Sequence, residues 1–203
     1  MTEPIDFYFD FSSSYSYIGQ HRLQDLAGMH GREVRWKPIA LGAIFKSVGS
    51  GPHSPETSKG TYVWKDVERS AADAGLPYLW PNPFPFNSLM AARIFYYIGK
   101  KDKAKAIEWA RAVFDASFGQ GKDCSDSTEL AAIAIKLDLN ADELLEACNQ
   151  DEIKQKLKQV TAEAMQKGVF GAPTFFVDGD MYWGADRIDQ MNRYLGRQLP
   201  SDS

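Results

Sequence analysis

The stretch IDFYFDFSSSYSYIG, residues 5–19, joins an alternating segment to a run of serines and then to a segment of helical character. In its first half, Asp6, Tyr8 and Asp10 alternate with apolar residues, which are Ile5, Phe7, Phe9 and Phe11. A period of two predicts a β-strand that has one apolar face and ends near Phe11. The serines that follow are either a polar cap for the next helix or the place of a catalytic group.

The residues after the serines predict a helix and then a second strand. The apolar stripe of this helix consists of Ile18, Leu23, Leu26 and Ala27. Gly28 and Gly31 supply its C-terminal stop. The segment EVRWKPIAL, residues 33–41, is again typical of a strand. Because a helix connects two strands of one sheet, we expect the strands to be parallel, with the usual right-handed connection.

The middle of the chain has a different character. Helix signals run from about Thr57 to Lys167, and two loop-like segments interrupt them: GLPYLWPNPFPFNS, residues 75–88, and FGQGKDCSD, residues 118–126. Asn87 or Ser88 can cap the helix after the first of these loops. These patterns predict a mainly helical region.

The end of the chain returns to strand periodicity. The segment PTFFVDGDMYWG, residues 173–184, holds two short strand patterns around Asp178-Gly179, a dipeptide suited to a tight hairpin turn. Asp186 then lies in the first turn of a helix whose apolar stripe is Ile188, Met191 and Leu195. The order β-α-β, helical block, β-β-α predicts an α/β protein: a thioredoxin-like domain, residues 1–45 and 168–203, with a large helical insertion, residues 46–167.

Composition narrows the functional classes. The chain has 203 residues, 44% of them apolar, which is enough for a sizeable core. Its net charge of −4 disfavours nucleic-acid binding, so we expect small-molecule partners. No signal peptide or bilayer-spanning run is visible, so we expect no membrane association and a cytoplasmic location. Cys124 and Cys148 lie far from each other and from any histidine, so neither a disulfide framework nor a metal site is expected.

Three short signals could carry chemistry, although each has a purely structural explanation. Ser13 or Ser14 follows the first strand where a helix begins, and a hydroxyl there can donate to a thiolate that the helix dipole stabilises. Serine is also among the best helix caps, and capping alone would explain it. Ala172-Pro173 precedes the third strand; the bond is predicted to be cis, which would expose the preceding backbone to a ligand. Asp186 can bind a ligand ammonium or simply cap its helix.

Together these motifs resemble a known family. The segments DFYFDFSSSYSYIG (6–19), FPFNSLMAAR (84–93) and GAPTFFVDGDMYWGADR (171–187) resemble the 2-hydroxychromene-2-carboxylate isomerases, close relatives of kappa-class glutathione transferases. The resemblance implies a thioredoxin-like domain interrupted by a helical domain, glutathione as cofactor, and a homodimer. Related thiol oxidases carry Cys-x-x-Cys where this chain has Ser13, Ser14, Tyr15 and Ser16, so the resemblance excludes a dithiol oxidase.

The same resemblance implies roles for individual residues. Ser13 would be the catalytic serine that hydrogen-bonds the glutathione sulfur, although serine at position 14, where the family often has proline, leaves Ser14 as an alternative. Ala172, before Pro173, would pair with the cysteinyl backbone. The γ-glutamyl end would be held by Trp183, Gly184, Ala185 and Asp186. Contacts to the substrate would come from Gly49, Ser50 and Asn87.

For several other residues the sequence favours a structural role over a role in binding. Lys37 and Lys46 could pair with a substrate carboxylate, but the interpretation as surface lysines is stronger. The histidines, at positions 21, 30 and 53, have no partners at ligand spacing, so we expect them to be structural or exposed. The aromatic segment YLWPNPFPF, residues 78–86, is more often a packed loop than a binding platform, although it could wall an aromatic substrate.

The resemblance implies an isomerase that interconverts 2-hydroxychromene-2-carboxylate and trans-o-hydroxybenzylidenepyruvate, an aromatic ketoacid, through thiolate addition, bond rotation and elimination. One alternative is a kappa-class-like transferase that conjugates electrophiles and consumes glutathione. The other is a non-catalytic thioredoxin-like binding module. The sequence alone leaves all three open.

Overall fold

The computed structural model describes residues 3–53 and 56–198. Its strands are β1 (Ile5–Phe9), β2 (Val34–Pro38), β3 (Thr174–Val177) and β4 (Asp180–Trp183). Its α-helices are α1 (Ser14–Met29), α2 (Leu41–Ser47), α3 (Ser58–Asp73), α4 (Leu89–Gly99), α5 (Lys103–Phe114), α6 (Ser127–Lys136), α7 (Ala141–Ala147), α8 (Asp151–Gln166) and α9 (Ile188–Gln198). A π-helical turn, Asp115–Gly119, follows α5, and a 3₁₀ turn, Ala185–Arg187, precedes α9.

The strands form one mixed sheet in the order β2-β1-β3-β4. β1 and β2 are parallel, with Phe7 opposite Trp36, as the connection through α1 predicts. β3 is antiparallel to both β1 and β4. The hairpin between β3 and β4 turns through Asp178 (φ 51°) and Gly179 (φ 92°), the positive angles that a type I′ turn requires. The predicted class, a thioredoxin-like α/β fold with a helical insertion, is confirmed.

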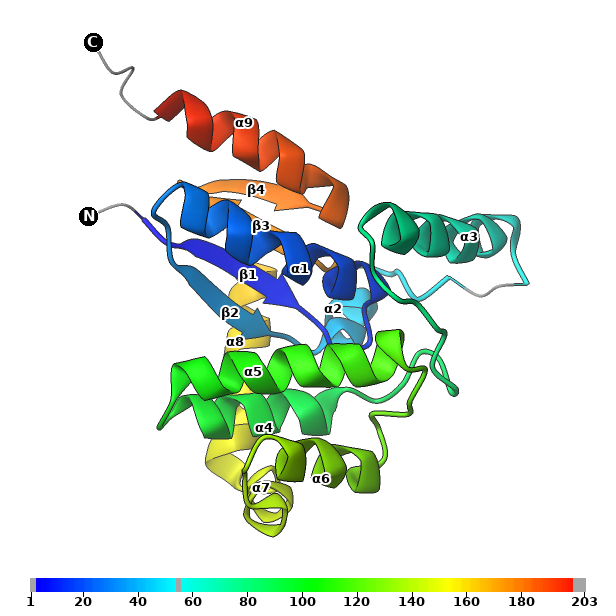
Figure 1. Ribbon diagram of the computed structural model, residues 1–203, viewed down its shortest axis with the longest axis vertical. Coiled ribbons are helices and arrows are strands. Elements are labelled where there is room, and N and C mark those ends of the chain that lie inside the picture. Colours follow the sequence, from blue (N-terminus) through cyan, green and yellow to red (C-terminus); the bar gives the residue numbers. More distant parts are fainter. Residues whose placement is uncertain (1–2, 54–55, 199–203) are drawn as a thin grey trace.

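Both faces of the sheet are covered, which corrects the expectation that β1 has one apolar face. Ile5, Phe7 and Phe9 pack into the main core, on the face where Figure 1 shows α1 and α9. Tyr8 is also fully buried, in a second cluster that includes Val160 of α8. The alternation in β1 therefore separates two buried faces. On the second face, the buried positions hold an aromatic residue, Tyr8, and a paired carboxylate, Asp6, in place of aliphatic residues.

The first strand ends at Phe9, two residues earlier than predicted. The Asp10 carboxylate accepts a hydrogen bond from the Ser12 N–H at 2.8 Å, and the Asp10 carbonyl accepts one from the Ser13 N–H at 3.0 Å. These two bonds close a turn in place of a longer strand. At the other end of α1, Gly28 lies inside the helix, and Gly31, with φ 61°, follows its end.

The insertion carries most of the helices. In Figure 1, α4 and α5 lie side by side below the sheet with α6 and α7 beyond them, while α3 stands apart near the start of α1. One continuous core joins the residues of this region to the sheet. The predicted domain boundaries remain predictions, and their ranges include residues 1–2, 54–55 and 199–203, outside the described residues. Among the helices of the described residues, none has the length and apolar character needed to cross a membrane.

Candidate functional site

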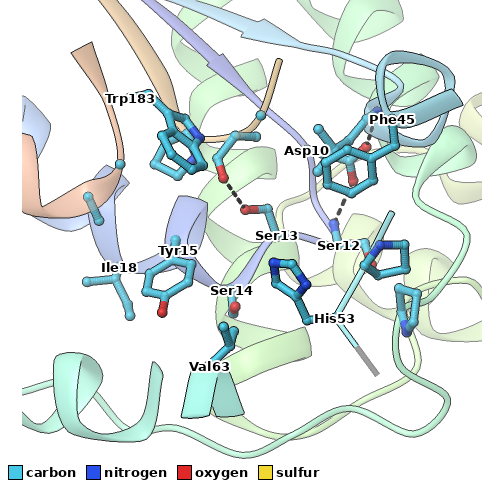
Figure 2. A pocket seen from close by; sticks show the side chains of 18 of the residues that line it. Asp10, Ser12, Ser13, Ser14, Tyr15, Ile18, Phe45, His53, Val63 and Trp183 are labelled. Carbon is cyan, nitrogen blue, oxygen red and sulfur yellow. Dashed lines mark hydrogen bonds between the residues drawn. The ribbon is translucent and has the colours of Figure 1, made fainter. Parts of the chain in front are cut away.

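A large cleft opens where β1 ends and α1 begins. Its volume is about 1870 Å³. A site for one small ligand typically has about 300–1,000 Å³, so this cleft has room for two. The loop before β3 and the turn after β4 line one side of it, and α2, α3 and the proline-rich segment line the other. Figure 2 shows Ser13 between Trp183 on one side and Asp10 and Phe45 on the other.

Ser13 combines the two roles that the sequence leaves open. It is the N-cap of α1, and its hydroxyl oxygen accepts a hydrogen bond from the Ser16 N–H at 3.2 Å. The same hydroxyl donates to the Ala172 carbonyl at 3.1 Å (Figure 2). Capping is therefore present, but it uses only a lone pair of the oxygen, and the hydroxyl proton is donated to the loop before β3.

The neighbouring serines are placed differently. The Ser12 hydroxyl accepts from the Phe86 N–H at 3.1 Å, so it ties the proline-rich segment to the start of α1. Ser14 lines the cleft, whereas Ser16 is fully buried and is not among the lining residues. Ser13 and Ser14 thus both reach the cleft, and of these two Ser13 is the one hydrogen-bonded to the backbone of the loop before β3.

The Ala172–Pro173 bond is cis, as predicted, and so are Asn82–Pro83 and Phe84–Pro85 in the proline-rich segment. The Pro173 carbonyl accepts from the Gly184 N–H at 3.0 Å. This bond fixes the loop before β3 against the turn after β4. Ala172, Pro173 and the residues 183–186 all line the cleft, so the structure brings together the whole set predicted for cofactor binding.

Two glycines let side chains of the wall formed by residues 171–186 lie directly against its backbone. A Cβ on Gly171 would lie 2.5 Å from Nε1 of Trp183, and a Cβ on Gly184 (φ 111°) would lie 2.4 Å from Oδ1 of Asp186. Asp186 is inside the 3₁₀ turn, whose N-cap is Gly184, and its carboxylate pairs with the guanidinium of Arg187. Trp183 is 52% exposed and packs edge-on against Phe170.

The residues predicted for substrate contact are only partly brought together. Ser50 and Asn87 line the cleft, but Gly49 is not among its lining residues. Gly49 has φ 65° and follows α2, where it lets the chain turn. The Asn87 side chain accepts from the Leu89 N–H at 3.1 Å, so it also serves the start of α4.

An aromatic wall forms the far side of the cleft. The rings of Trp64 and Trp80 stack at 3.8 Å between centroids, and Phe84 contacts both edge-on. The sequence marked residues 78–86 as a packed loop or a substrate wall, but Trp64 was missed. It lies within α3, and no local signal distinguishes it from a helix residue that packs in a core.

One further group agrees with the sequence interpretation and one corrects it. His53 is exposed, as expected, and it lines the cleft, where desolvation of the ring and the nearby Lys59 lower the pKa of its imidazole. Lys37 instead donates to Asp6 and Glu163 at 3.2 and 2.9 Å, in the cluster of polar groups beneath the second face of the sheet. Within the described residues, no group of His, Cys, Asp and Glu side chains is arranged to hold a metal ion.

Comparison with known proteins agrees with this geometry. The family of DSBA-like thioredoxin domains matches residues 4–196. A 2-hydroxychromene-2-carboxylate isomerase of Sphingobium xenophagum is 35% identical over 197 residues, 96% of this chain and 99% of that protein. The chain belongs to the 2-hydroxychromene-2-carboxylate isomerase family. It is therefore an enzyme, and the alternative of a non-catalytic binding module is set aside.

Further comparisons give one solved isomerase and two more distant proteins. A solved 2-hydroxychromene-2-carboxylate isomerase superimposes with a TM-score of 0.86 at 30% identity, covering 96% of this chain and 95% of that one. Human glutathione S-transferase kappa 1 is 24% identical over 96% of this chain and 91% of its own length. The cytosolic disulfide reductase DsbM of Pseudomonas aeruginosa, solved with GSH, shares the fold alone, with a TM-score of 0.69 at 15% identity over 98% of this chain and 100% of that one.

Proposed function

We propose that this protein is a glutathione-dependent isomerase that interconverts 2-hydroxychromene-2-carboxylate and trans-o-hydroxybenzylidenepyruvate. The observation that carries the proposal is the Ser13 hydroxyl, which caps α1 and donates to the Ala172 carbonyl at the edge of the cleft. A hydrogen-bond donor at a helix N-terminus favours the ionised form of a bound thiol. The family membership supports the reaction class.

The contacts of Ser13 fit the thiol end of glutathione. A serine hydroxyl has one proton, and in this structure the Ala172 carbonyl accepts it. When a thiolate is bound, we expect Ser13 to donate to the sulfur instead, and the Ala172 carbonyl then becomes free to accept the cysteinyl N–H. The exchange leaves no polar group of this pair without a partner.

The wall of residues 171–186 fits the rest of the tripeptide. Because Gly171 and Gly184 have no Cβ, the Trp183 ring and the Asp186 carboxylate can lie directly against the backbone of this wall. We propose that Trp183, Gly184 and Ala185 hold the γ-glutamyl end, with Asp186 accepting from its α-ammonium. Because the Asp186 carboxylate is already paired with Arg187, the ligand ammonium must share it or displace the guanidinium.

Bound glutathione supplies a nucleophilic thiolate that adds to the ring-opened enone, so that the former double bond can rotate before elimination restores it. The chain has three tasks in this chemistry. The Ser13 hydroxyl and the α1 N-terminus lower the pKa of the thiol. The cleft excludes water around the sulfur, and its far wall orients the acceptor.

The acceptor is proposed to lie between Ser13 and the aromatic wall of Trp64, Trp80 and Phe84. An aromatic ketoacid presents a flat ring to such a wall and polar oxygens to Ser50 and Asn87. Gly49 is outside the lining, so we propose that it acts by ending α2 and directing Ser50 into the cleft. Ser14 remains an alternative donor to the sulfur.

The test is a spectrophotometric assay with 2-hydroxychromene-2-carboxylate, run with and without glutathione. An isomerase equilibrates the chromene with the trans ketoacid and leaves the glutathione concentration unchanged. The kappa-class relatives favour a second candidate, a conjugating transferase, which would consume one glutathione for each product. No rate enhancement with the chromene in the presence of glutathione would reject the isomerase, and none with other enones or halogenated acceptors would reject the transferase as well.

A homodimer is proposed on the family resemblance, and a cytoplasmic location is proposed from the sequence. Size-exclusion chromatography with light scattering measures the first directly. A mass of about 23 kDa, that of one 22.7 kDa chain, would reject the dimer. Fractionation of cells that express the protein tests the second.

A further inference from the structure

The buried carboxylate of Asp10 accepts hydrogen bonds from several elements that line the cleft. Asp10 is 4% exposed and lies just after β1, where it lines the cleft beside Ser13. One carboxylate oxygen accepts from the Ser12 N–H at 2.8 Å, and the other accepts from the Leu41 N–H at 2.8 Å (Figure 2). The Ser88 hydroxyl is a third donor toward it.

These donors belong to three separate elements. Ser12 is in the turn that presents Ser13, Leu41 is the first residue of α2, and Ser88 is the N-cap of α4. The N-cap of α2 is Ala40, whose side chain has no acceptor, so the carboxylate supplied by Asp10 takes the place of a local cap. A carboxylate at the N-terminus of a helix is also favoured by the helix dipole.

Each of these elements carries a group that faces the cleft. The turn carries Ser13, α2 carries Phe45, and Asn87 immediately precedes Ser88. Burial raises the pKa of Asp10, because it disfavours the ionised carboxylate, and the hydrogen bonds from its donors oppose this effect. Loss of one acceptor would leave a buried N–H without a partner, and the element that carries it would be free to shift.

We propose that Asp10 is a positioning residue. It sets the distance between the thiol site at Ser13 and two residues on the acceptor side of the cleft, Phe45 and Asn87. The inference rests on the proposed function, because it assigns the two sides of the cleft to glutathione and to the acceptor. In this role Asp10 contacts neither glutathione nor the acceptor. Its effect should fall on the acceptor and on turnover, and much less on glutathione.

The variant Asp10→Asn tests this directly, because an amide has one acceptor oxygen where the carboxylate has two. With 2-hydroxychromene-2-carboxylate at saturating glutathione, we expect KM for the chromene to rise at least fivefold and kcat to fall about tenfold. The Kd of glutathione, measured by calorimetry, should stay within about twofold of the parent. The matched control is Asp126→Asn, which alters a capping aspartate that accepts from the Thr128 N–H at 2.8 Å outside the cleft.

A milder variant keeps the test decisive if Asp10→Asn does not fold. Ser88→Ala removes only the donor from α4, and it should raise KM for the chromene about two- to threefold with an unchanged glutathione Kd. If either folded variant lowers activity only in proportion to its folded fraction, as Asp126→Asn would, Asp10 is a structural cap and the inference is wrong. Equal losses of glutathione and chromene binding would also overturn it. A parent protein that binds glutathione but does not isomerise the chromene would instead reject the proposed function.

Discussion

The two sides of the cleft are built in different ways. The glutathione side consists of short motifs at the ends of strands: the serines after β1, Ala172-Pro173 before β3, and the turn after β4. Its contacts are mostly backbone to backbone, or one side chain to backbone. The acceptor side consists of rings and loops from α2, α3 and the proline-rich segment, which meet only in the folded chain.

This difference predicts how each side responds to change. Backbone geometry is set by the sheet and is insensitive to most surface substitutions, so a general cofactor can be held by a fixed frame. Side chains packed from separate helices can be exchanged one at a time, so specificity for the acceptor can vary without loss of the cofactor site. Substitutions on the two sides should therefore separate glutathione binding from acceptor binding.

The largest effect should come from Ser13→Ala. Loss of the hydrogen bond to the thiolate should remove about 1.5 to 3 kcal/mol of stabilisation, which corresponds to a fall in kcat/KM of about 13- to 160-fold. The pKa of the bound thiol should rise, and the thiolate absorbance of bound glutathione against pH measures it. Ser14→Ala is the control and should titrate like the parent. If the upward shift occurs in Ser14→Ala instead, the role moves by one residue.

Asp186→Asn should act on the glutathione side alone. If Asp186 accepts from the γ-glutamyl ammonium, its loss should weaken glutathione binding by about 1 to 3 kcal/mol, with the fold nearly intact. The pairing with Arg187 complicates the interpretation, so Arg187→Gln is the matched control and should strengthen binding or leave it unchanged. Calorimetry with glutathione measures both. An unchanged affinity in Asp186→Asn would leave this residue with only a structural role in the turn.

Trp80→Leu should act on the acceptor side alone. It removes the stack on Trp64 and the hydrogen bond from Nε1 to Glu68 at 3.1 Å. An aromatic contact contributes about 0.5–1.5 kcal/mol beyond its buried area, so KM for an aromatic acceptor should rise roughly two- to tenfold while the Kd of glutathione stays constant. Leu79→Ala, at an exposed neighbour outside the cleft lining, is the control. A change in glutathione affinity of similar size would contradict the separation of the two sides.

The same contrast explains which parts of the molecule could be predicted from the sequence. The order of strands and helices and the hairpin at Asp178-Gly179 follow from patterns within a few residues of each other. The cofactor residues are implied by the family resemblance, and the structure brings those residues to one cleft. The assignment of their roles remains a prediction. The second buried face of β1 could not be foreseen, because it depends on α8, which lies about 150 residues later in the chain.

The acceptor side was less predictable for a physical reason. Trp64 and Trp80 are 16 residues apart and stack only because α3 and the proline-rich segment return to the same place. No local pattern marks His53 as a cleft residue, because its position there depends on the path of the chain after α2. In the sequence, Asp10 is simply the last polar residue of an alternating strand. Its role cannot be seen there, because its three donors come from residues 12, 41 and 88.

The smallest effect is expected from a substitution that touches neither side. Glu163 lies beneath the second face of the sheet, where it accepts from Tyr8 at 2.8 Å and Lys37 at 2.9 Å. The hydrogen bond from Lys37 is the main cause that lowers the pKa of Glu163 to about 2, from an ordinary value of 4.5. A carboxyl whose pKa is lower in the folded state stabilises the fold above pH 4.5 and loses that contribution as the pH falls toward 2.

Because the Glu163 side chain is 40% exposed, solvent screens these contacts, and Glu163→Gln should cost at most about 1 kcal/mol of unfolding free energy at pH 7. The difference between the variant and the parent, measured by urea unfolding, should shrink between pH 5 and about pH 2 because the parent carboxyl is then protonated as well. At pH 7 the Kd of glutathione and KM for the chromene should both match those of the parent. A change in either constant would mean that the sheet transmits strain from its second face to the cleft, and the two sides could then no longer be treated as independent of the rest of the fold.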